Sequence, residues 1–518
     1  FKHESEIIQP GYHRLYLDRY HTWVEYTATD RVAFYRLNYT KGDTAKLLVD
    51  VGSVLGNCSM NKARLHRLSD TCILGEFVTT DRFWGGPDNI PLFFVLECNR
   101  PFLSADGWNE TGILPDAEQV AGDAAGMVLN FDLKDSNEVM FKIGMSYTSM
   151  ENAADNLRAE LDGWDFDGVR RETRAIWNDT LGRIAVEGGS DAQRIKFYTD
   201  LWHVLLGRHK ISDANGWYPD YAGGRYVEKR SADPMKLRRV PLDGNGTPKF
   251  SMYGFDGIWL TQWNLNILWG LAWPEIMDDF TACLVQYADN GGLLPRGGCA
   301  GGYSFIMTGC PSTSMLVSAY MKGIMKKTDP MHAYEVIKRN HLPGGMMSHE
   351  SADDLKFYIR HGYCPDNAGK TLEWAFQDWG LSRMAARLGK KSDAREFERR
   401  SHGWTPLFHA GEKLIFPKTH TGEWVHTDPL DGRGWVEANS WQATWSLSHD
   451  LPKLIGMMGG NDAFCEKLNY AFEQARDLDF VYAYSGGYVS YANQPGCSNA
   501  HVFSWGGKPW LTQYWVRR

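Results

Sequence analysis

Residues 22–39 read TWVEYTATDRVAFYRLNY, and this stretch decides how the first part of the chain folds. Aromatic and β-branched residues alternate with polar ones on both sides of Thr29 and Asp30. Alternation with a period of two is typical of a strand with one buried face, and a Thr-Asp pair suits a tight turn. The stretch therefore predicts two strands, 22–29 and 32–39, joined by a turn.

The same alternation continues on both sides of this hairpin. It recurs at residues 12–16, 46–51, 72–79, 92–98, 126–131 and 139–147. Glycines such as Gly52 and Gly56 punctuate the pattern. Many short strands at near-regular spacing predict an all-β sandwich or barrel over residues 1–148.

The pattern changes to a helical one near Ser149, which suits an N-cap before an acidic first turn. Ala153, Leu157 and Leu161 then fall on one helical face. We expect residues 149–190 to form a helical linker and residues 191–518 to be mainly helical. Helical periodicity is present at 192–208, 260–271, 274–287, 313–325, 332–339, 370–388, 393–401, 440–449, 453–458 and 462–478. About ten helices in pairs suggest an α/α toroid, although this layout alone gives no function.

Composition excludes several classes of protein. The chain has 518 residues and a net charge of −8, which argues against nucleic acid as a partner because phosphate binding needs a basic surface. No apolar run is long enough for a membrane span. Nine cysteines without a C-x-x-C pair leave both free thiols and one or two disulfides open.

The richest candidate site is GWVEANSWQATW at residues 434–445. Glu437 lies among Trp435, Trp441 and Trp445 just before a predicted helix. Burial beside aromatic rings raises a carboxyl pKa, as a general acid at neutral pH requires. The alternative is that Glu437 only favours the helix N-terminus and that the tryptophans are core residues.

Two further stretches carry weaker signals. Asp256 in YGFDGIWLTQW (253–263) could clamp two sugar hydroxyls, or simply cap the helix that follows. The loop YVSYANQP (488–495) offers amide and backbone oxygens of the kind that calcium prefers, but a polar loop at the mouth of a barrel explains it nearly as well.

The order of these stretches, with shorter motifs around them, resembles glycoside hydrolase family 92. The shorter motifs are HE (3–4), PGY (10–12), TATDRV (27–32), GWDFD (163–167), VEGG (186–189), LPR (294–296), KTLE (370–373), MGG (458–460), GKPW (507–510) and TQ (512–513). The resemblance is collinear over nearly the whole chain. It implies an N-terminal β-sandwich, a helical linker and a C-terminal (α/α)6 barrel, with the active site between the domains. It also implies a calcium-dependent, inverting exo-α-mannosidase that is exported from the cell.

The resemblance assigns roles to individual residues. Glu437 matches the catalytic acid of the family's E-G-N-x-W-Q stretch, although Ala438 replaces glycine. Asp256 matches the aspartate that holds mannose in the −1 subsite. The remaining residues implied for binding the substrate are Asn439, Trp441 and Gln442, and the calcium ligands are Asn493 and Gln494. Gln494 replaces a glutamate, which weakens the case for a strict α-1,2 preference.

The resemblance also implies a general base downstream of residues 509–513, where the chain soon reaches Arg518. We therefore expect this sequence to be truncated at both ends. The partner expected is an α-mannoside glycan. The alternatives are a relative that cleaves mannose from a phosphodiester, another sandwich-plus-toroid glycosidase or phosphorylase, and a mannan-binding protein without turnover.

Overall fold

The computed structural model describes residues 1–81, 85–223, 226–227, 230–231, 233–255, 257–478, 480–481 and 485–518. The chain divides into two compact units. The first comprises Phe1–Phe255 and Gly298–Ser304, and the second contains the rest of the described chain. Each unit is built around hydrophobic clusters of its own.

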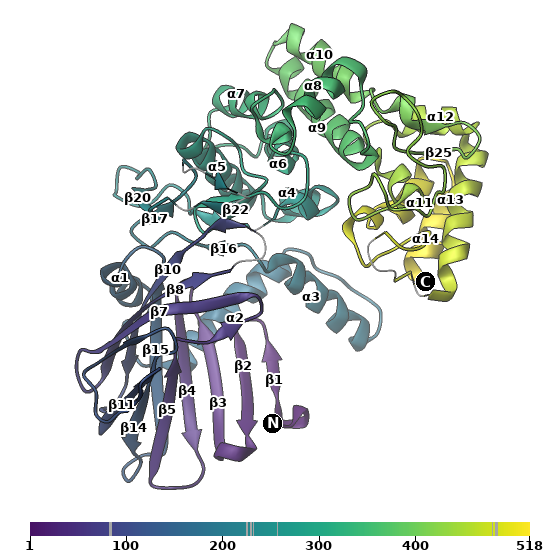
Figure 1. The fold of residues 1–518 in the computed structure, drawn as a ribbon. Coiled ribbons are helices and arrows are strands. Elements are labelled where there is room, and N and C mark those ends of the chain that lie inside the picture. Colours follow the sequence, from purple (N-terminus) through teal and green to yellow (C-terminus); the bar gives the residue numbers. More distant parts are fainter. Residues whose placement is uncertain are drawn as a thin grey trace. The chain divides into compact units, whose positions relative to one another are not determined.

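The first unit contains two antiparallel sheets (Figure 1). In the described part of the chain, the larger has ten strands in the order β1-β2-β3-β4-β15-β10-β8-β7-β13, with β6 paired to β7. Their bounds are Ile7–Gln9 (β1), Tyr12–Leu17 (β2), Thr22–Ala28 (β3), Val32–Tyr39 (β4), Val54–Leu55 (β6), Cys58–Arg67 (β7), Cys72–Thr80 (β8), Ile90–Cys98 (β10), Gln119–Gly122 (β13) and Glu138–Ser146 (β15). The register Thr22↔Tyr39 and Ala28↔Ala33 shows that residues 22–39 form the expected hairpin.

The smaller sheet has the order β12-β11-β14-β5, with Gly112–Leu114 (β12), Ser104–Asn109 (β11), Gly126–Asp132 (β14) and Thr44–Asp50 (β5). Inward-facing residues of both sheets share one core, with Leu37, Ile73 and Phe94 from the larger sheet and Met127 and Leu129 from the smaller. Two sheets that bury a common apolar layer form a β-sandwich. The prediction of a β-sandwich is confirmed.

Two helices cover the outer face of the larger sheet. They are Met150–Glu160 (α1) and Phe166–Gly182 (α2), and the cluster that they share with the sheet includes Phe34, Val95, Leu157 and Phe166. Ser149 caps α1 by accepting a hydrogen bond from the Asn152 N–H, as predicted. A third helix, Asp191–Leu205 (α3), follows them in the same unit.

Short strands complete the first unit. They are Gly86–Pro87 (β9), His209–Lys210 (β16), Trp217–Asp220 (β17), Tyr226–Val227 (β18), Arg230–Ser231 (β19), Lys236–Arg239 (β20), Tyr253–Gly254 (β21), Gly297–Cys299 (β22) and Gly302–Ser304 (β23). The division into 1–148, 149–190 and 191–518 stays a prediction.

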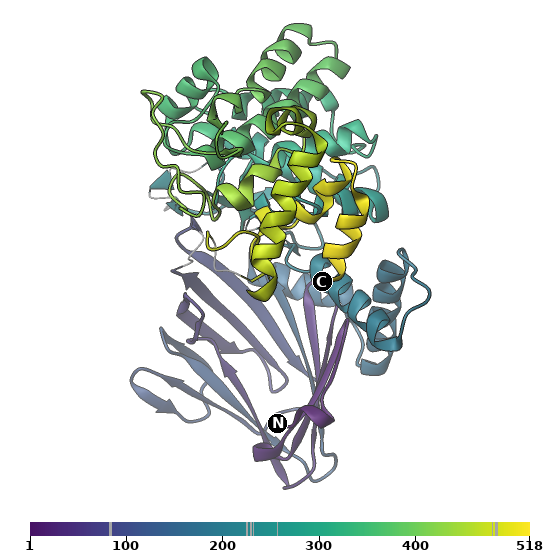
Figure 2. The same ribbon diagram turned by 90° about the vertical axis from the view of Figure 1, so that its right-hand side faces the viewer.

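The second unit is mainly helical (Figure 2). Its α-helices are Leu265–Ala272 (α4), Pro274–Gly291 (α5), Pro311–Met321 (α6), Pro330–Asn340 (α7), Ala352–His361 (α8), Ala368–Arg387 (α9), Lys391–Ser401 (α10), Ser440–Ala443 (α11), Leu451–Met458 (α12), Asn461–Ala475 (α13) and Pro509–Arg517 (α14). A 3-10 helix, Trp259–Gln262 (η3), precedes α4, and the pair Phe408–His409 (β24) and Leu414–Ile415 (β25) lies between α10 and α11. A β region followed by a helical one is therefore confirmed, whereas closure into an (α/α)6 barrel stays a prediction.

Helix α9 is the central element of this unit. It packs against α6, α7 and α10, and residues on most sides of it are buried. A helix enclosed in this way must satisfy each of its polar side chains with a partner inside the protein. The polar groups of α9, above all Glu373, Gln377 and Asp378, therefore have to find their partners on neighbouring segments.

Two general expectations can be compared with the structure. All nine cysteines lie within the described residues and are free thiols. In the described part of the chain, no helix combines the length and apolar character that crossing a membrane requires.

Candidate active site

The loop before α11 holds Glu437 in an unusual backbone conformation. Its φ is 50°, in the left-handed region that residues other than glycine rarely adopt. Such a conformation costs on the order of 1–2 kcal/mol and is found disproportionately at functional sites. Ala438, where the resemblance implies glycine, is buried and has no positive φ, so this position does not require glycine.

Asn493 fixes the side chain of Glu437. The Asn493 Nδ2 donates to the Glu437 carboxylate Oε2 at 2.9 Å and to the Glu437 backbone oxygen at 2.9 Å. The amide group of Asn493 thus holds both the backbone and the carboxylate of Glu437. Asn493 and Glu437 are 56 positions apart in sequence. The structure therefore brings together two residues that the sequence predicts separately.

Two other predicted residues, Asn439 and Gln442, use their side-chain amides for hydrogen bonds within the protein. Asn439 caps α11 through Oδ1 and donates through Nδ2 to the backbone oxygens of Ser485 (2.7 Å) and Gly487 (2.8 Å). Gln442 donates to the backbone oxygens of Gly486 and Gly487. These amides hold the loop around residues 485–487 in place.

Trp441 is a core residue in this structure. Its ring is 5% exposed and packs against Tyr470 and Tyr488, with the Lys467 ammonium 4.4 Å from the ring centroid. Its surroundings agree with the core alternative drawn from the sequence. The prediction for Asp256 falls outside the described residues.

The predicted calcium ligands do not form a calcium site by themselves. The Asn493 Oδ1 accepts from the Gln494 N–H at 3.0 Å, and its Nδ2 is directed to Glu437. The Asn499 Oδ1 is a buried oxygen without a hydrogen-bond partner. Calcium takes six to eight oxygens, and no cluster of three or more His, Cys, Asp or Glu residues occurs in the part of the chain that the structure describes. The donors present fit the ion in type but not in number.

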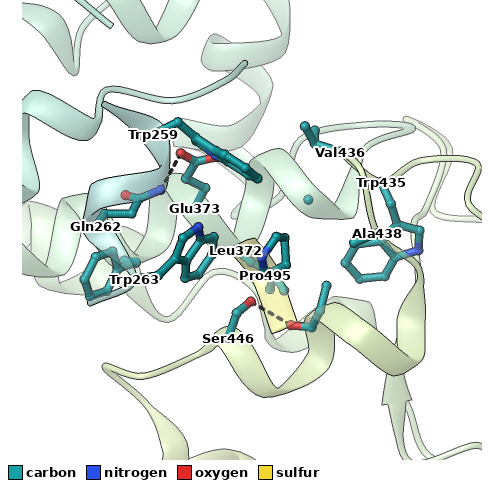
Figure 3. Close-up of a pocket in the computed structure, with 13 residues that line it drawn as sticks. Trp259, Gln262, Trp263, Leu372, Glu373, Trp435, Val436, Ala438, Ser446 and Pro495 are labelled. Carbon is teal, nitrogen blue, oxygen red and sulfur yellow. Dashed lines mark hydrogen bonds between the residues drawn. The ribbon is translucent and has the colours of Figure 1, made fainter. Parts of the chain in front are cut away.

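A pocket in the second unit lies beside the Glu437 loop. Its walls are aromatic and apolar, and its lining residues are Trp259, Gln262, Trp263, Gly369, Leu372, Glu373, Phe376, Trp435, Val436, Ala438, Ala443, Ser446 and Pro495. Glu437 is not among them, although both of its neighbours are. Figure 3 shows Trp435, Val436 and Ala438 at one end and Trp259, Gln262, Trp263 and Glu373 at the other.

The start of α9 joins the two ends of this pocket. The Ala368 N–H donates to the Gly434 oxygen at 2.8 Å. Gly434 has φ 77°, and a Cβ there would lie 2.6 Å from the Cβ of Pro417. Glycine at this position therefore lets the Glu437 loop lie against Pro417.

Glu373 is a functional candidate that the sequence analysis missed. Its carboxylate accepts from Trp259 Nε1 (3.0 Å), Gln262 Nε2 (2.9 Å) and Gln377 Nε2 (3.3 Å). Burial raises the pKa of Glu373 to about 7, and the hydrogen bonds from Gln262 and Trp259 and the charge of Arg296 only partly oppose this shift. The sequence analysis quoted Glu373 only as the last residue of the KTLE motif (370–373) and gave it no role.

Comparisons with known proteins agree with this architecture. The model of the glycosyl hydrolase family 92 catalytic domain matches residues 152–518, and that of its N-terminal domain matches residues 1–146. The chain belongs to glycosyl hydrolase family 92. An uncharacterized secreted glycosidase from Arthroderma benhamiae is 21% identical over 434 residues, which are 75% of this chain and 48% of the relative. The chain thus spans about half the length of this curated relative.

Solved structures of family 92 proteins share the fold. The α-mannosidase BT3965 from Bacteroides thetaiotaomicron has a TM-score of 0.85 at 22% identity, with 100% of this chain and 66% of that chain covered. The inverting mannosidase BT2199 from the same organism has a TM-score of 0.84 at 24% identity, with 100% and 69% covered. At these identities the likeness shows the fold of this family 92 chain and does not by itself assign its substrate.

Proposed function

We propose that this family 92 chain is a glycoside hydrolase that releases mannose from the ends of α-mannoside glycans, with Glu437 as its general acid. The observation that carries the proposal is a glutamate held at a positive φ by Asn493, beside an aromatic pocket. The solved family 92 structures support mannose as the sugar, since they include a complex of BT3965 with mannoimidazole.

The mechanism assigns a proton transfer to Glu437. With Oε2 accepting from Asn493, the acid proton resides on Oε1 and passes to the glycosidic oxygen as the bond to the sugar breaks. Inversion requires a second carboxylate about 6.5–9.5 Å away that activates water on the opposite face of the sugar. BT2199 is described as inverting, which supports this stereochemistry here.

The same proposal includes three further properties. The enzyme depends on calcium, it is not strictly specific for α-1,2 linkages, and it is exported from the cell. A bound calcium ion would take hydroxyl oxygens of the sugar as ligands. The secreted relative from Arthroderma benhamiae supports export.

The test is mannose release from α-1,2-, α-1,3-, α-1,4- and α-1,6-mannobiose by this chain and by a version extended past Arg518, with calcium or with a chelator. Glu437→Gln should lower kcat about 10²–10⁴-fold, because general acid catalysis contributes that much. Loss on 2,4-dinitrophenyl α-mannoside should be far smaller, since that leaving group needs no proton. The matched control is Glu423→Gln, which changes an exposed glutamate.

Each outcome is decisive for one part of the proposal. Wild-type rates on mannobiose for a folded Glu437→Gln variant would refute the assignment of the acid. An equal loss on both kinds of substrate would show that Glu437 binds substrate without donating a proton. Release that is unchanged by the chelator would refute the dependence on calcium.

A further inference from the structure

The polar end of the pocket contains one acceptor and one donor that the protein does not use fully. A carboxylate offers about four lone-pair sites, and Glu373 receives three N–H donors, from Trp259, Gln262 and Gln377. At least one acceptor site remains.

The unused donor is the indole N–H of Trp263. This Nε1 is buried and has no hydrogen-bond partner, while its ring meets the ring of Trp259 edge to face at a centroid distance of 5.8 Å. Leaving a buried donor without a partner costs about 1–3 kcal/mol. Figure 3 shows Trp263 at the same end of the pocket as the Glu373 carboxylate.

A glycine contacts the Glu373 carboxylate. Gly309 has φ 68°, and a Cβ there would lie 2.8 Å from the Glu373 Oε1. Any larger residue at position 309 would displace the carboxylate. The position of Glu373 is therefore specified by neighbouring backbone as well as by its hydrogen bonds.

We propose that Glu373 and Trp263 form a hydroxyl-binding floor in this pocket, which takes one hydroxyl group of a monosaccharide. A hydroxyl donates one hydrogen bond and accepts others, so it matches a carboxylate acceptor beside an indole donor. The pocket volume is about 30 Å³, which admits a hydroxyl group but not a sugar ring, so the ring would lie at the mouth of the pocket with its apolar face on the aromatic side chains. If the proposed function is correct, the hydroxyl belongs to the mannosyl unit.

The charges around the floor favour a neutral ligand over a cation. Arg296, which pairs with Glu350, lowers the pKa of Glu373, and Glu350 raises it, while Lys370 pairs with Glu350 from the first turn of α9. Glu373 itself is in no ion pair within the described residues. The indole N–H of Trp263 beside the carboxylate disfavours a cation and can donate a hydrogen bond to a ligand oxygen.

The experiment follows the indole N–H signals of the full chain, labelled with ¹⁵N-tryptophan, during titration with mannose, glucose and galactose. Trp263→Phe removes the donor and keeps a ring. The matched control is Trp374→Phe, which removes another buried, unpartnered indole N–H next to Glu373 in sequence but outside the pocket lining. The two variants also assign the two signals.

We expect mannose to shift the Trp263 signal and to leave the Trp374 signal in place. Trp263→Phe should weaken mannose binding about 2–10-fold, as loss of one neutral hydrogen bond predicts, and Trp374→Phe less than 2-fold. Among the 2-, 3-, 4- and 6-deoxymannoses, one should bind wild type more weakly than mannose does, and Trp263→Phe should abolish that difference.

The outcomes separate this inference from the proposed function. If no sugar shifts the Trp263 signal, or if both variants weaken binding equally, the hydroxyl-binding floor is refuted. If another monosaccharide shifts the signal and mannose does not, the floor stands and the proposed substrate is wrong.

Discussion

Helix α9 contains two buried carboxylates, Glu373 and Asp378, whose surroundings differ. Asp378 accepts from Arg400 Nε (2.7 Å) and Tyr358 Oη (2.8 Å), and it bonds to His341 Nδ1 at 2.7 Å. Glu373 receives only neutral N–H donors. Glu373 lines the aromatic pocket described above, and Asp378 does not.

The difference indicates that Asp378 has a structural role, whereas the carboxylate of Glu373 can contact a ligand. Thr313, His341 and Asp378 form a hydrogen-bonded chain like that of a serine protease, yet all three are fully buried. A cation compensates the charge of Asp378, and no ligand can reach it. Glu373 lacks a cation within salt-bridge distance in the described chain, and burial raises its pKa.

Asp378→Asn should have the largest effect on stability. It leaves the buried Arg400 without a counter-ion, and breaking a buried pair in this way costs about 3–5 kcal/mol. Urea unfolding measures the loss. Asp353→Asn, at an exposed aspartate on α8 that pairs with Lys356, should cost less than about 0.5 kcal/mol. A loss below about 1 kcal/mol for Asp378→Asn would remove the contrast between the two carboxylates.

Glu373→Gln should change the pH dependence of stability. The ordinary pKa of 4.5 is raised to about 7 in the folded protein, so the native state binds more protons than the unfolded state between these values. Wild-type stability therefore falls as pH rises through this window, by about 3 kcal/mol relative to the variant. Urea unfolding of both proteins at pH 5 and pH 8 measures the change, and Glu423→Gln should show none. Parallel curves for wild type and Glu373→Gln would contradict the raised pKa.

Tyr358→Phe should have the smallest effect of the three. It removes one donor to Asp378 and leaves Arg400 and His341 in place, which predicts a loss of about 1–2 kcal/mol. The ring also packs edge to face against Trp374, and phenylalanine keeps that contact. The exposed Tyr20→Phe is the control, measured in the same way. A loss as large as that of Asp378→Asn would show that the network acts as one unit.

Local patterns predicted much of the fold. The hairpin at residues 22–39 coincides with β3 and β4, and the expected helix 370–388 nearly matches α9. The predicted helix 260–271 is divided into η3 and α4 because Asn264 has a non-helical φ of −155°. The expected helix 440–449 stops after Ala443, and its next residues form a 3-10 turn.

The site could be predicted only in part. Glu437 stood out because it is a carboxyl among tryptophans, and Asn493 because amides suit a polar loop. That these two residues meet depends on a contact across 56 positions, which no local pattern contains. The same limit hid Glu373, since the neutral donors around it come from η3 as well as from its own helix.

Because Glu437 has a positive φ, selection for stability and selection for activity would favour different residues at position 437. Glycine or asparagine would adopt this conformation more easily than glutamate does. Laboratory evolution that rewards heat resistance alone would therefore drive position 437 toward those residues. Laboratory evolution that rewards sugar release would retain the glutamate, and stabilising substitutions would then occur at other positions of the loop.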